Sequence, residues 1–339
     1  MKNGSFVAAF EAAFAEYVGA KYAIATSNGT VSIEAALVAL LGDGDNPNDW
    51  RVCVPPLTMS ATTIAALNAG YRPHFVDVDP KTWLMEPPVG SGLALTVSLF
   101  GLHAKYPGGL WIDDAAQTLR KHDHEASFTS LSFQASKVLA LGEGGALLTN
   151  DERLARRARS YLSLGYEMEA DQARIDSRAI RSPDFERHHL ARSINGRMND
   201  LTAARGLVYL AEAGEFLAGR RRAAQFYAAA VAGCPWITPQ YVPEGWTFDA
   251  WAYAFAVESV DLWHPLTAAM VRHGAEMPYG CWRITYKEPA FRHLAPDGTC
   301  PVAEDLQPRI VQCQTNNLES AERNANALQR AIQEVGGSR

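Results

Sequence analysis

The sequence predicts an α/β protein: a mainly parallel sheet covered by helices on both faces, followed by a smaller C-terminal α+β domain. Up to Asn150, short apolar runs alternate with helix-like segments, as in parallel sheets that are buried on both faces. After Asn150 the chain becomes mostly helical. The chain of 339 residues is 47% apolar and 20% charged, which is enough for a substantial core. We therefore predict a large domain over residues 1–205 and a smaller one, including its connecting helices, over residues 206–339.

The predicted elements follow in order along the chain. Phe6, Phe10, Phe14 and Tyr17 recur at helical spacing, which predicts an amphipathic helix over residues 6–18. Apolar runs predict strands at 22–26, 51–54, 74–78, 93–99, 110–113, 128–133 and 146–149. Helical patterns lie at 31–41, 60–68 and 152–164.

The second part of the chain begins with a charged, aperiodic segment at residues 166–190, which predicts a long loop. One strand-like run lies at 251–257, and residues 278–301 are irregular. Helices are predicted at 199–217, 218–232, 262–273 and 318–334.

Composition excludes several classes of protein. The net charge of −6 and the pI near 5.9 argue against a nucleic-acid partner. No apolar run reaches the length of a membrane span, and no secretory signal pattern begins the sequence. Five cysteines without paired spacing indicate reduced thiols and a cytoplasmic protein.

Two charged clusters have ordinary explanations. Residues 220–222 are three arginines in a helix-like stretch, and we favour a solvated helix face over an anion site. His122 and His124 lie in a polar run, where a solvated loop is favoured over a metal site. We therefore predict no metal.

The chemistry is indicated by one lysine and one carboxylate. Lys137 lies between apolar runs and just before a glycine-rich turn, and Asp114 ends an apolar run upstream. Parallel strands bring their carboxyl ends to one edge of a sheet, so the two side chains are expected to meet. Pyridoxal 5'-phosphate (PLP) needs this pair, because a lysine forms a Schiff base with its aldehyde and a carboxylate keeps its pyridine nitrogen protonated.

Each of these residues also has a simpler interpretation. Lys137 could be a surface lysine that extends over apolar neighbours, although the small residues Ser132 and Ser136 leave room for a ligand beside it. Asp114 could cap a helix, since two alanines follow. The turn at residues 27–30 suits a phosphate at a helix N-terminus but is also an ordinary strand-to-helix turn.

Several segments together resemble the DegT/DnrJ/StrS family of PLP-dependent sugar aminotransferases, which have the fold-type I architecture of aspartate aminotransferase. The resemblance runs from about Phe6 to Ala204 and continues more weakly to the end. It is carried by these segments: 10–19, 27–30, 54–62, 75–80, 114–117, 132–137, 144–151 and 195–197.

The resemblance implies a role for individual residues. Lys137 matches the Schiff-base lysine, Asp114 the partner of the pyridine nitrogen, and Gln117 a residue near the phenolic oxygen of the cofactor. The expected phosphate ligands are Ser132, Gly29, Thr30 and Asn195. Asn195 matches an asparagine that reaches the neighbouring subunit's phosphate, which implies a homodimer with shared sites.

The chain departs from the family pattern mainly on the substrate side. Met59 stands where an aromatic residue usually covers the cofactor ring, and a methionine sulfur can also contact a ring. Ser98 stands at a usual histidine, Ser193 at a usual glycine and Thr202 at a usual glutamine. The sequence also begins almost at the first helix, without the N-terminal arm typical of the family.

The resemblance implies transfer of an amino group from glutamate or glutamine to the keto group of a sugar, usually nucleotide-linked, by a ping-pong mechanism through Lys137. One alternative is a PLP enzyme of the same fold that acts on a non-sugar natural-product ketone or catalyses a dehydration. Relatives that dehydrate sugars carry histidine at the lysine position, so Lys137 favours transamination. A further alternative is a PLP-binding protein without catalytic activity.

Overall fold

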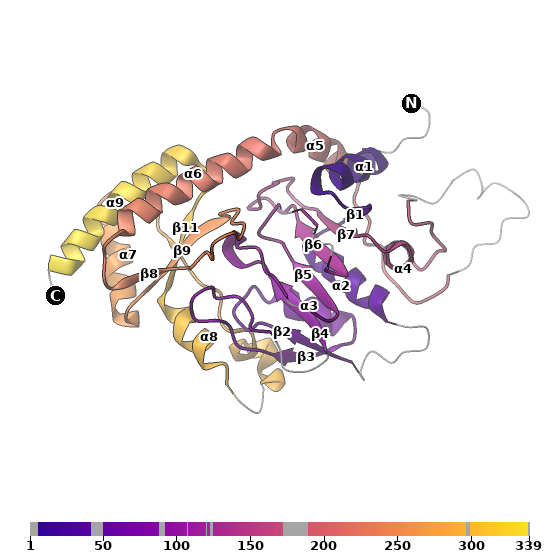
Figure 1. Ribbon diagram of the computed structural model, residues 1–339, viewed down its shortest axis with the longest axis horizontal. Coiled ribbons are helices and arrows are strands. Elements are labelled where there is room, and N and C mark those ends of the chain that lie inside the picture. Colours follow the sequence, from indigo (N-terminus) through magenta and orange to yellow (C-terminus); the bar gives the residue numbers. More distant parts are fainter. Residues whose placement is uncertain are drawn as a thin grey trace, which may run out of the picture.

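The computed structural model of the chain describes residues 6–41, 50–87, 92–106, 108–119, 121–122, 125–171, 189–295 and 299–337. Within these residues the chain forms a seven-stranded sheet and a four-stranded sheet, with helices packed around both. Helices α5 (Asp200–Ala211) and α6 (Ala213–Val231) follow one another as a long arch above the two sheets (Figure 1).

The larger sheet is mainly parallel, as the sequence predicts. Its strands run in the order β1-β7-β6-β5-β4-β2-β3 among the described residues. β7 is antiparallel to both of its neighbours, β1 and β6, whereas the other pairings are parallel. The bounds of the seven strands are β1 Tyr22–Thr26, β2 Arg51–Val54, β3 Arg72–Phe75, β4 Leu93–Val97, β5 Trp111–Asp114, β6 Phe128–Ser132 and β7 Gly145–Thr149.

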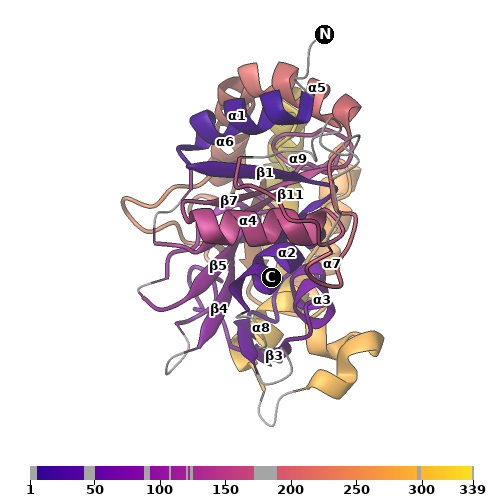
Figure 2. The ribbon, with the colours of Figure 1, turned by 90° about the vertical axis from the view of Figure 1, so that its right-hand side faces the viewer.

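Apolar side chains of the larger sheet enter two separate cores, because successive residues of a strand point to opposite faces. On β7, Leu147 packs with the core under α2 (Gly29–Leu40), α3 (Ala61–Asn68) and α4 (Glu152–Leu162), while Leu148 packs with the core under α1 (Phe6–Val18). Figure 2 shows α1 and α4 on opposite sides of β1. The predicted covering of both faces is therefore confirmed.

α5 continues the layer formed by α1. Gly206 makes their close approach possible, because a Cβ at this position would lie 2.6 Å from the ring of Phe10. The boundary predicted after residue 205 falls within α5 and stays a prediction.

The smaller sheet is antiparallel, in the order β10-β11-β9-β8. Helices α6, α7 and α9 pack together around a third apolar core that includes Tyr227, Phe255 and Leu328. The bounds of these elements are β8 Ile237–Pro239, β9 Ala252–Val257, α7 Trp263–Arg272, β10 Tyr279–Gly280, α8 Pro301–Leu306, β11 Ile310–Gln314 and α9 Leu318–Gly337.

Several predicted bounds are wrong. The strand predicted at 74–78 is β3, which begins two residues and ends three residues earlier. The break between the two long helices falls at Glu212 rather than near Leu217. β8, β11 and α8 had no predicted counterpart. Most of the predicted 166–190 loop, and His124, lie outside the described residues.

Two further observations concern composition. No disulfide joins the five cysteines, all of which the structure describes. Within the described part of the chain, none of the helices is long and apolar enough to cross a membrane, and no cluster of three potential ligands could hold a metal ion.

Candidate active site

The structure brings most of the predicted site residues together at the carboxyl edge of the larger sheet. Asp114 ends β5, Ser132 ends β6, and Gly29 begins α2 three residues after β1 ends. Strand pairing places Asp114 directly beside Ser130 of β6. Lys137 lies in the loop that connects β6 to β7. Ligands of sheets of this kind bind at this edge.

The N-terminus of α2 and the end of β6 together form an anion-binding geometry. Asn28 caps α2 by accepting the N–H of Val31 at 2.9 Å. The N–H groups of Gly29 and Thr30 have no acceptor within the helix, because they belong to its first turn. A Cβ on Gly29 would lie 2.9 Å from Cβ and 3.4 Å from Oγ of Ser132. Two N–H groups and a hydroxyl therefore converge at the positive end of the helix dipole, which suits a phosphate.

Asp114 is buried without a cationic hydrogen-bond partner among the described residues. Its side chain is 5% exposed and accepts hydrogen bonds from Thr62 Oγ1 at 2.7 Å and from the N–H of Ala116 at 3.2 Å. Burial raises the pKa of Asp114; these two hydrogen bonds lower it, the charge of Asp113 raises it and that of Lys137 lowers it. A protonated pyridine nitrogen would supply the missing positive charge.

The neighbouring carboxylate, Asp113, points to different partners, as the strand geometry predicts. Ser98 Oγ donates to it at 3.0 Å, and Thr96 Oγ1 lies 3.3 Å from the same oxygen. Ser98 also accepts the N–H of Ala104 at 2.9 Å. The serine that replaces the family's histidine is therefore part of the hydrogen-bond network around Asp113.

Lys137 is half-buried in a braced loop. The N–H of Ala135 donates to the carbonyl of Gly142 at 2.9 Å, and the N–H of Lys137 donates to the carbonyl of Gln134 at 2.8 Å. The side chain of Gln134 accepts both the N–H and the hydroxyl of Ser136. Burial lowers the pKa of Lys137, the charge of Asp114 raises it and that of Arg220 lowers it. A lowered pKa favours the uncharged, nucleophilic amine.

Gln117 follows Asp114 by three residues, and Met59 is linked to Asp114 through Thr62. Gln117 is 4% exposed, and its Oε1 accepts the N–H of Phe100 at 2.5 Å, so its amide NH₂ is the group that can donate to a ligand. Met59 is 49% exposed at the turn before α3, and its carbonyl accepts the N–H of Thr62. Thr62 in turn contacts Asp114.

Asn195 lies in a segment that pairs with the chain just before α2. The carbonyl of Gly196 accepts the N–H of Ser27 at 2.8 Å, and Arg197 forms a bridge with Thr26. The side chain of Asn195 itself is exposed. Its predicted contact with another subunit's phosphate is not tested by a single chain.

Sequence reasoning missed three residues around the lysine and the carboxylate. The prediction of a solvated face for residues 220–222 is wrong for Arg220, which is 6% exposed and donates to the carbonyl of Lys137 at 3.1 Å. Trp251 places its ring 4.9 Å from Lys137 Nζ. Thr62, which contacts Asp114, lies in a segment that carried the family resemblance but received no role. Only its position after Met59 could have indicated it.

A pocket of about 300 Å³ lies beside the lysine loop, between the larger sheet's edge and the smaller sheet. Trp251 and Trp282 stack in its wall, with ring centroids 6.1 Å apart at 20°. Tyr279 and three amide side chains, Gln312, Gln314 and Asn316, complete the part that faces the smaller sheet. Arg220 also lines this pocket, which thus combines aromatic faces, uncharged hydrogen-bonding groups and one buried cation.

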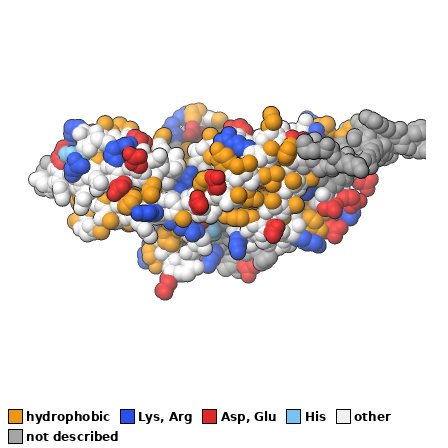
Figure 3. Space-filling view, turned by 90° about the horizontal axis from the view of Figure 1, so that it is seen from above, with side chains coloured by type: hydrophobic (Ala, Val, Ile, Leu, Met, Phe, Trp, Pro, Cys, Tyr) orange, Lys and Arg blue, Asp and Glu red, His pale blue; other side chains and the backbone are white. Residues whose placement is uncertain are grey.

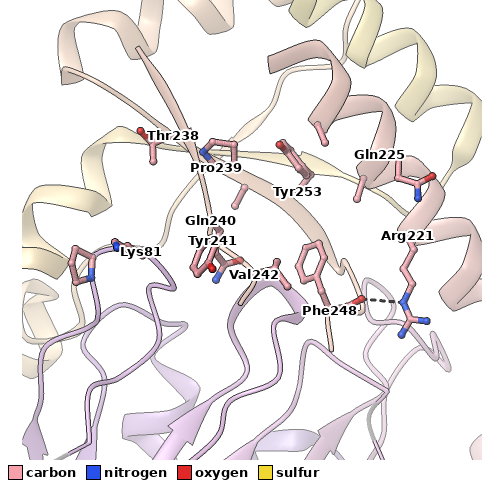
Figure 4. Close-up of a pocket in the computed structure, with 14 residues that line it drawn as sticks. Lys81, Arg221, Gln225, Thr238, Pro239, Gln240, Tyr241, Val242, Phe248 and Tyr253 are labelled. Carbon is pink, nitrogen blue, oxygen red and sulfur yellow. Dashed lines mark hydrogen bonds between the residues drawn. The ribbon is translucent and has the colours of Figure 1, made fainter. Parts of the chain in front are cut away.

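A larger cavity, of about 920 Å³, lies elsewhere between α6, β8 and β9 (Figure 4). Arg221, Tyr241, Phe248 and Tyr253 line it together with Lys81 of the larger domain, and its surface is mostly apolar. None of the residues predicted for the active site lines it. Size alone therefore does not identify the reactive site.

The described residues fit PLP. The convergence of helix N–H groups with Ser132 suits its phosphate, the buried Asp114 suits its pyridine nitrogen, and the desolvated Lys137 suits its aldehyde. A parallel sheet with these groups at its carboxyl edge defines a PLP-binding protein of fold type I.

Comparisons with known proteins identify the family. The chain belongs to the DegT/DnrJ/EryC1/StrS aminotransferase family, whose sequence profile matches residues 1–89 and 104–326. Enzymes of this family depend on PLP, so the cofactor predicted from the sequence is confirmed at this level.

Individual relatives agree with this. GDP-perosamine synthase of Caulobacter vibrioides is 31% identical over 66% of this chain and 61% of its own length. UDP-2-acetamido-2-deoxy-3-oxo-D-glucuronate aminotransferase of Pseudomonas aeruginosa is 30% identical over 66% of this chain and 63% of its own. The match thus spans less than two thirds of these relatives. The solved structure of Helicobacter pylori PseC, an aminotransferase involved in pseudoaminic acid biosynthesis, has the same fold, with a TM-score of 0.83, 19% identity, and coverage of 98% of this chain and 92% of its own.

Proposed function

We propose that the protein is a PLP-dependent aminotransferase that moves an amino group from an amino acid, glutamate or glutamine, to the keto group of a nucleotide-linked sugar. The observation that carries this proposal is the desolvated Lys137 beside the buried carboxylate of Asp114. The family and the activities printed in the names of its curated relatives support it.

PLP, when bound, would withdraw electrons from the substrate carbon and hold the amino group between the two half-reactions. Each residue has one task in this scheme. Asp114 would keep the pyridine nitrogen protonated, and the α2 N-terminus with Ser132 would anchor the phosphate. Lys137 would hold the cofactor, and its free amine would carry a proton to and from the substrate carbon.

The pocket beside Lys137 is the proposed site of the acceptor. Trp251 and Trp282 offer flat apolar faces to the ring of a sugar, and the amides of Gln312, Gln314 and Asn316 offer donors and acceptors to its hydroxyl groups. This combination supports an uncharged, hydroxylated ring as the part of the acceptor nearest the lysine.

We also infer that the active unit is a cytoplasmic homodimer. The α1–α5 face carries exposed apolar side chains: Phe6 is 42%, Leu201 86% and Val208 63% exposed. Seen from above, hydrophobic side chains gather on this face, in the half that lies toward α5 and α1 (Figure 3). Asn195 lies a few residues before α5, so a second subunit covering this face would lie next to it.

Borohydride trapping tests the proposed function. We expect PLP added to the purified protein to produce a visible absorbance band, and reduction to attach the cofactor at the peptide that contains Lys137. L-glutamate should bleach the band before reduction. Lys137→Ala should abolish trapping, whereas Lys287→Ala, an exposed lysine paired with Glu304, should not. Trapping on another lysine, or a band that no amino acid bleaches, would refute the proposal.

A further inference from the structure

Arg220 is a buried cation with an unusual set of partners. It is 6% exposed on the inner side of α6. Its Nη1 donates to the carbonyl of Trp251 at 2.9 Å and to Thr315 Oγ1 at 3.2 Å. Its Nη2 donates to the carbonyls of Ser136 at 3.4 Å and of Lys137 at 3.1 Å. Among the described residues no carboxylate forms an ion pair with it.

The two neighbouring arginines behave differently. Arg221 lies on the wall of the large cavity, where it donates to the carbonyl of Phe248 at 3.0 Å (Figure 4) and pairs with Asp249. Arg222 is exposed. Of the three, Arg220 alone contacts the loop that carries Lys137 within the described structure, so the inward position is specific to it.

The lysine loop is held by two residues from the second part of the chain, Arg220 and Trp251. The carbonyl of Ser136 accepts from Arg220 and also from the indole N–H of Trp251, the latter at 2.9 Å. The ring of Trp251 lies 4.9 Å from Lys137 Nζ. Together, Arg220 of α6 and Trp251, the residue before β9, fix the backbone on both sides of the Lys137 Cα and thereby the direction in which its side chain leaves the loop.

The charge of Arg220 also acts on the lysine. Burial lowers the pKa of Arg220 to about 10, so the guanidinium stays protonated at neutral pH. Two charged groups face Lys137 from the elements packed against it: Asp114 of β5 raises its pKa and Arg220 of α6 lowers it. Arg220 therefore opposes the attraction that Asp114 exerts on the lysine's proton.

Arg220 also lines the pocket beside the lysine, which raises the question of whether it binds a substrate carboxylate. The hydrogen bonds of Arg220 argue against such a role. The four N–H groups of Nη1 and Nη2 have four acceptors in the chain itself, so the two-pronged contact that arginine makes with a carboxylate is already occupied.

We propose that Arg220 is a positioning residue for Lys137: it fixes the backbone on both sides of the lysine Cα and places a positive charge at the base of the lysine side chain. This inference rests on the proposed role of Lys137 as the PLP-binding amine. It assigns the control of that amine to a residue of the connecting helix.

Trace acetylation with acetic anhydride, followed at the Lys137 peptide by mass spectrometry, tests the proposal on protein stripped of PLP. The reaction rate rises with pH as the amine loses its proton. Arg220→Met should move the midpoint of this profile upward, because a like charge that lowers the pKa of Lys137 is removed. Arg222→Met makes the same change at an exposed position of the same helix and should leave the midpoint unchanged.

Arg220→Lys separates charge from geometry. It keeps a positive charge but loses the planar fork that reaches four acceptors. We expect its midpoint to stay near that of the wild type while Lys137 acetylation above the midpoint changes several-fold, because the loop is no longer fixed. If Arg220→Met does not fold, Arg220→Lys still tests the proposed effect on the loop.

An Arg220→Met midpoint equal to that of the wild type, or an Arg220→Lys profile equal in both midpoint and rate, would overturn the inference. Borohydride trapping of PLP on the wild-type protein distinguishes a failure of the proposed function from a failure of the Arg220 inference. If PLP is trapped elsewhere than Lys137, the proposed function fails; if it is trapped at Lys137 but the Arg220 variants behave as the wild type does, only the present inference fails.

Discussion

Replacing Gly29 by alanine should weaken PLP binding without weakening the fold. Gly29 is the first residue of α2, and its N–H is one of the groups expected to face the phosphate. The added Cβ would lie 2.9 Å from Ser132 Cβ, whereas ordinary contacts begin at 3.4 Å. The difference, 3.4 − 2.9 = 0.5 Å, is the distance by which the start of α2 and the end of β6 must separate.

The size of the effect follows from this separation. A misplacement of about 1 Å can reduce binding or catalysis by roughly a hundredfold. Half that displacement should weaken PLP binding about tenfold, or ~1.4 kcal/mol. Alanine is the better helix former by up to about 1 kcal/mol, so the unfolding free energy should hardly fall.

Titration of the apoprotein with PLP measures the binding change, and urea unfolding measures stability. Gly219→Ala in α6 is the matched control, because nothing lies within 4 Å of a Cβ built there. It should raise stability slightly and leave the dissociation constant for PLP unchanged. If Gly29→Ala bound PLP as tightly as the wild type does, the phosphate would not lie against the N-terminus of α2.

Two further predictions concern buried charges. Arg159→Met should lower the free energy of unfolding by about 3–5 kcal/mol in urea, because it leaves Glu11, 7% exposed and bonded to Arg159 at 2.9 Å, without its partner. Thr62→Val removes a hydrogen bond to the ionised form of Asp114 and should therefore raise that residue's pKa further. Ionised Asp114 is the form that holds the pyridine nitrogen. As the pH is lowered, the variant should therefore lose PLP binding at a higher pH than the wild type does.

Neighbouring residues provide the controls. Arg156 lies on the same helix as Arg159. Arg156→Met breaks exposed ion pairs with Glu152 and Glu169 and should change stability by less than about 1 kcal/mol. Thr63→Val changes a buried hydroxyl that has no hydrogen-bond partner among the described residues. Equal losses for Arg159→Met and Arg156→Met, or equal pH profiles for Thr62→Val and Thr63→Val, would contradict the reasoning.

The strands and the main site residues could be predicted because their signals are local. β1, β5 and β6 are short apolar runs between turns, and Asp114 and Ser132 stand at their carboxyl ends. The edge at which parallel strands end then brings distant residues together without further information.

The remaining features depend on contacts that a sequence does not display. Three consecutive arginines look alike in the chain, and only the packing of α6 against the lysine loop distinguishes the buried Arg220 from the exposed Arg222. β11 alternates apolar residues with Gln312 and Gln314, so its run was not recognised as an inner strand of the smaller sheet. The helix break at Glu212 has no proline or glycine signal at that residue.

β7 is the one reversed strand among the described strands of the larger sheet, and its direction affects how the loop that carries Lys137 is held. A parallel crossover would carry the chain from the end of β6 back to the opposite edge of the sheet before the next strand could begin. Because β7 runs antiparallel to β6, the connecting loop both departs from and returns to the ligand edge. The loop that carries Lys137 is thus fixed at both ends by strands of the sheet. A longer loop would make the reactive amine more mobile while leaving every strand of the sheet in register.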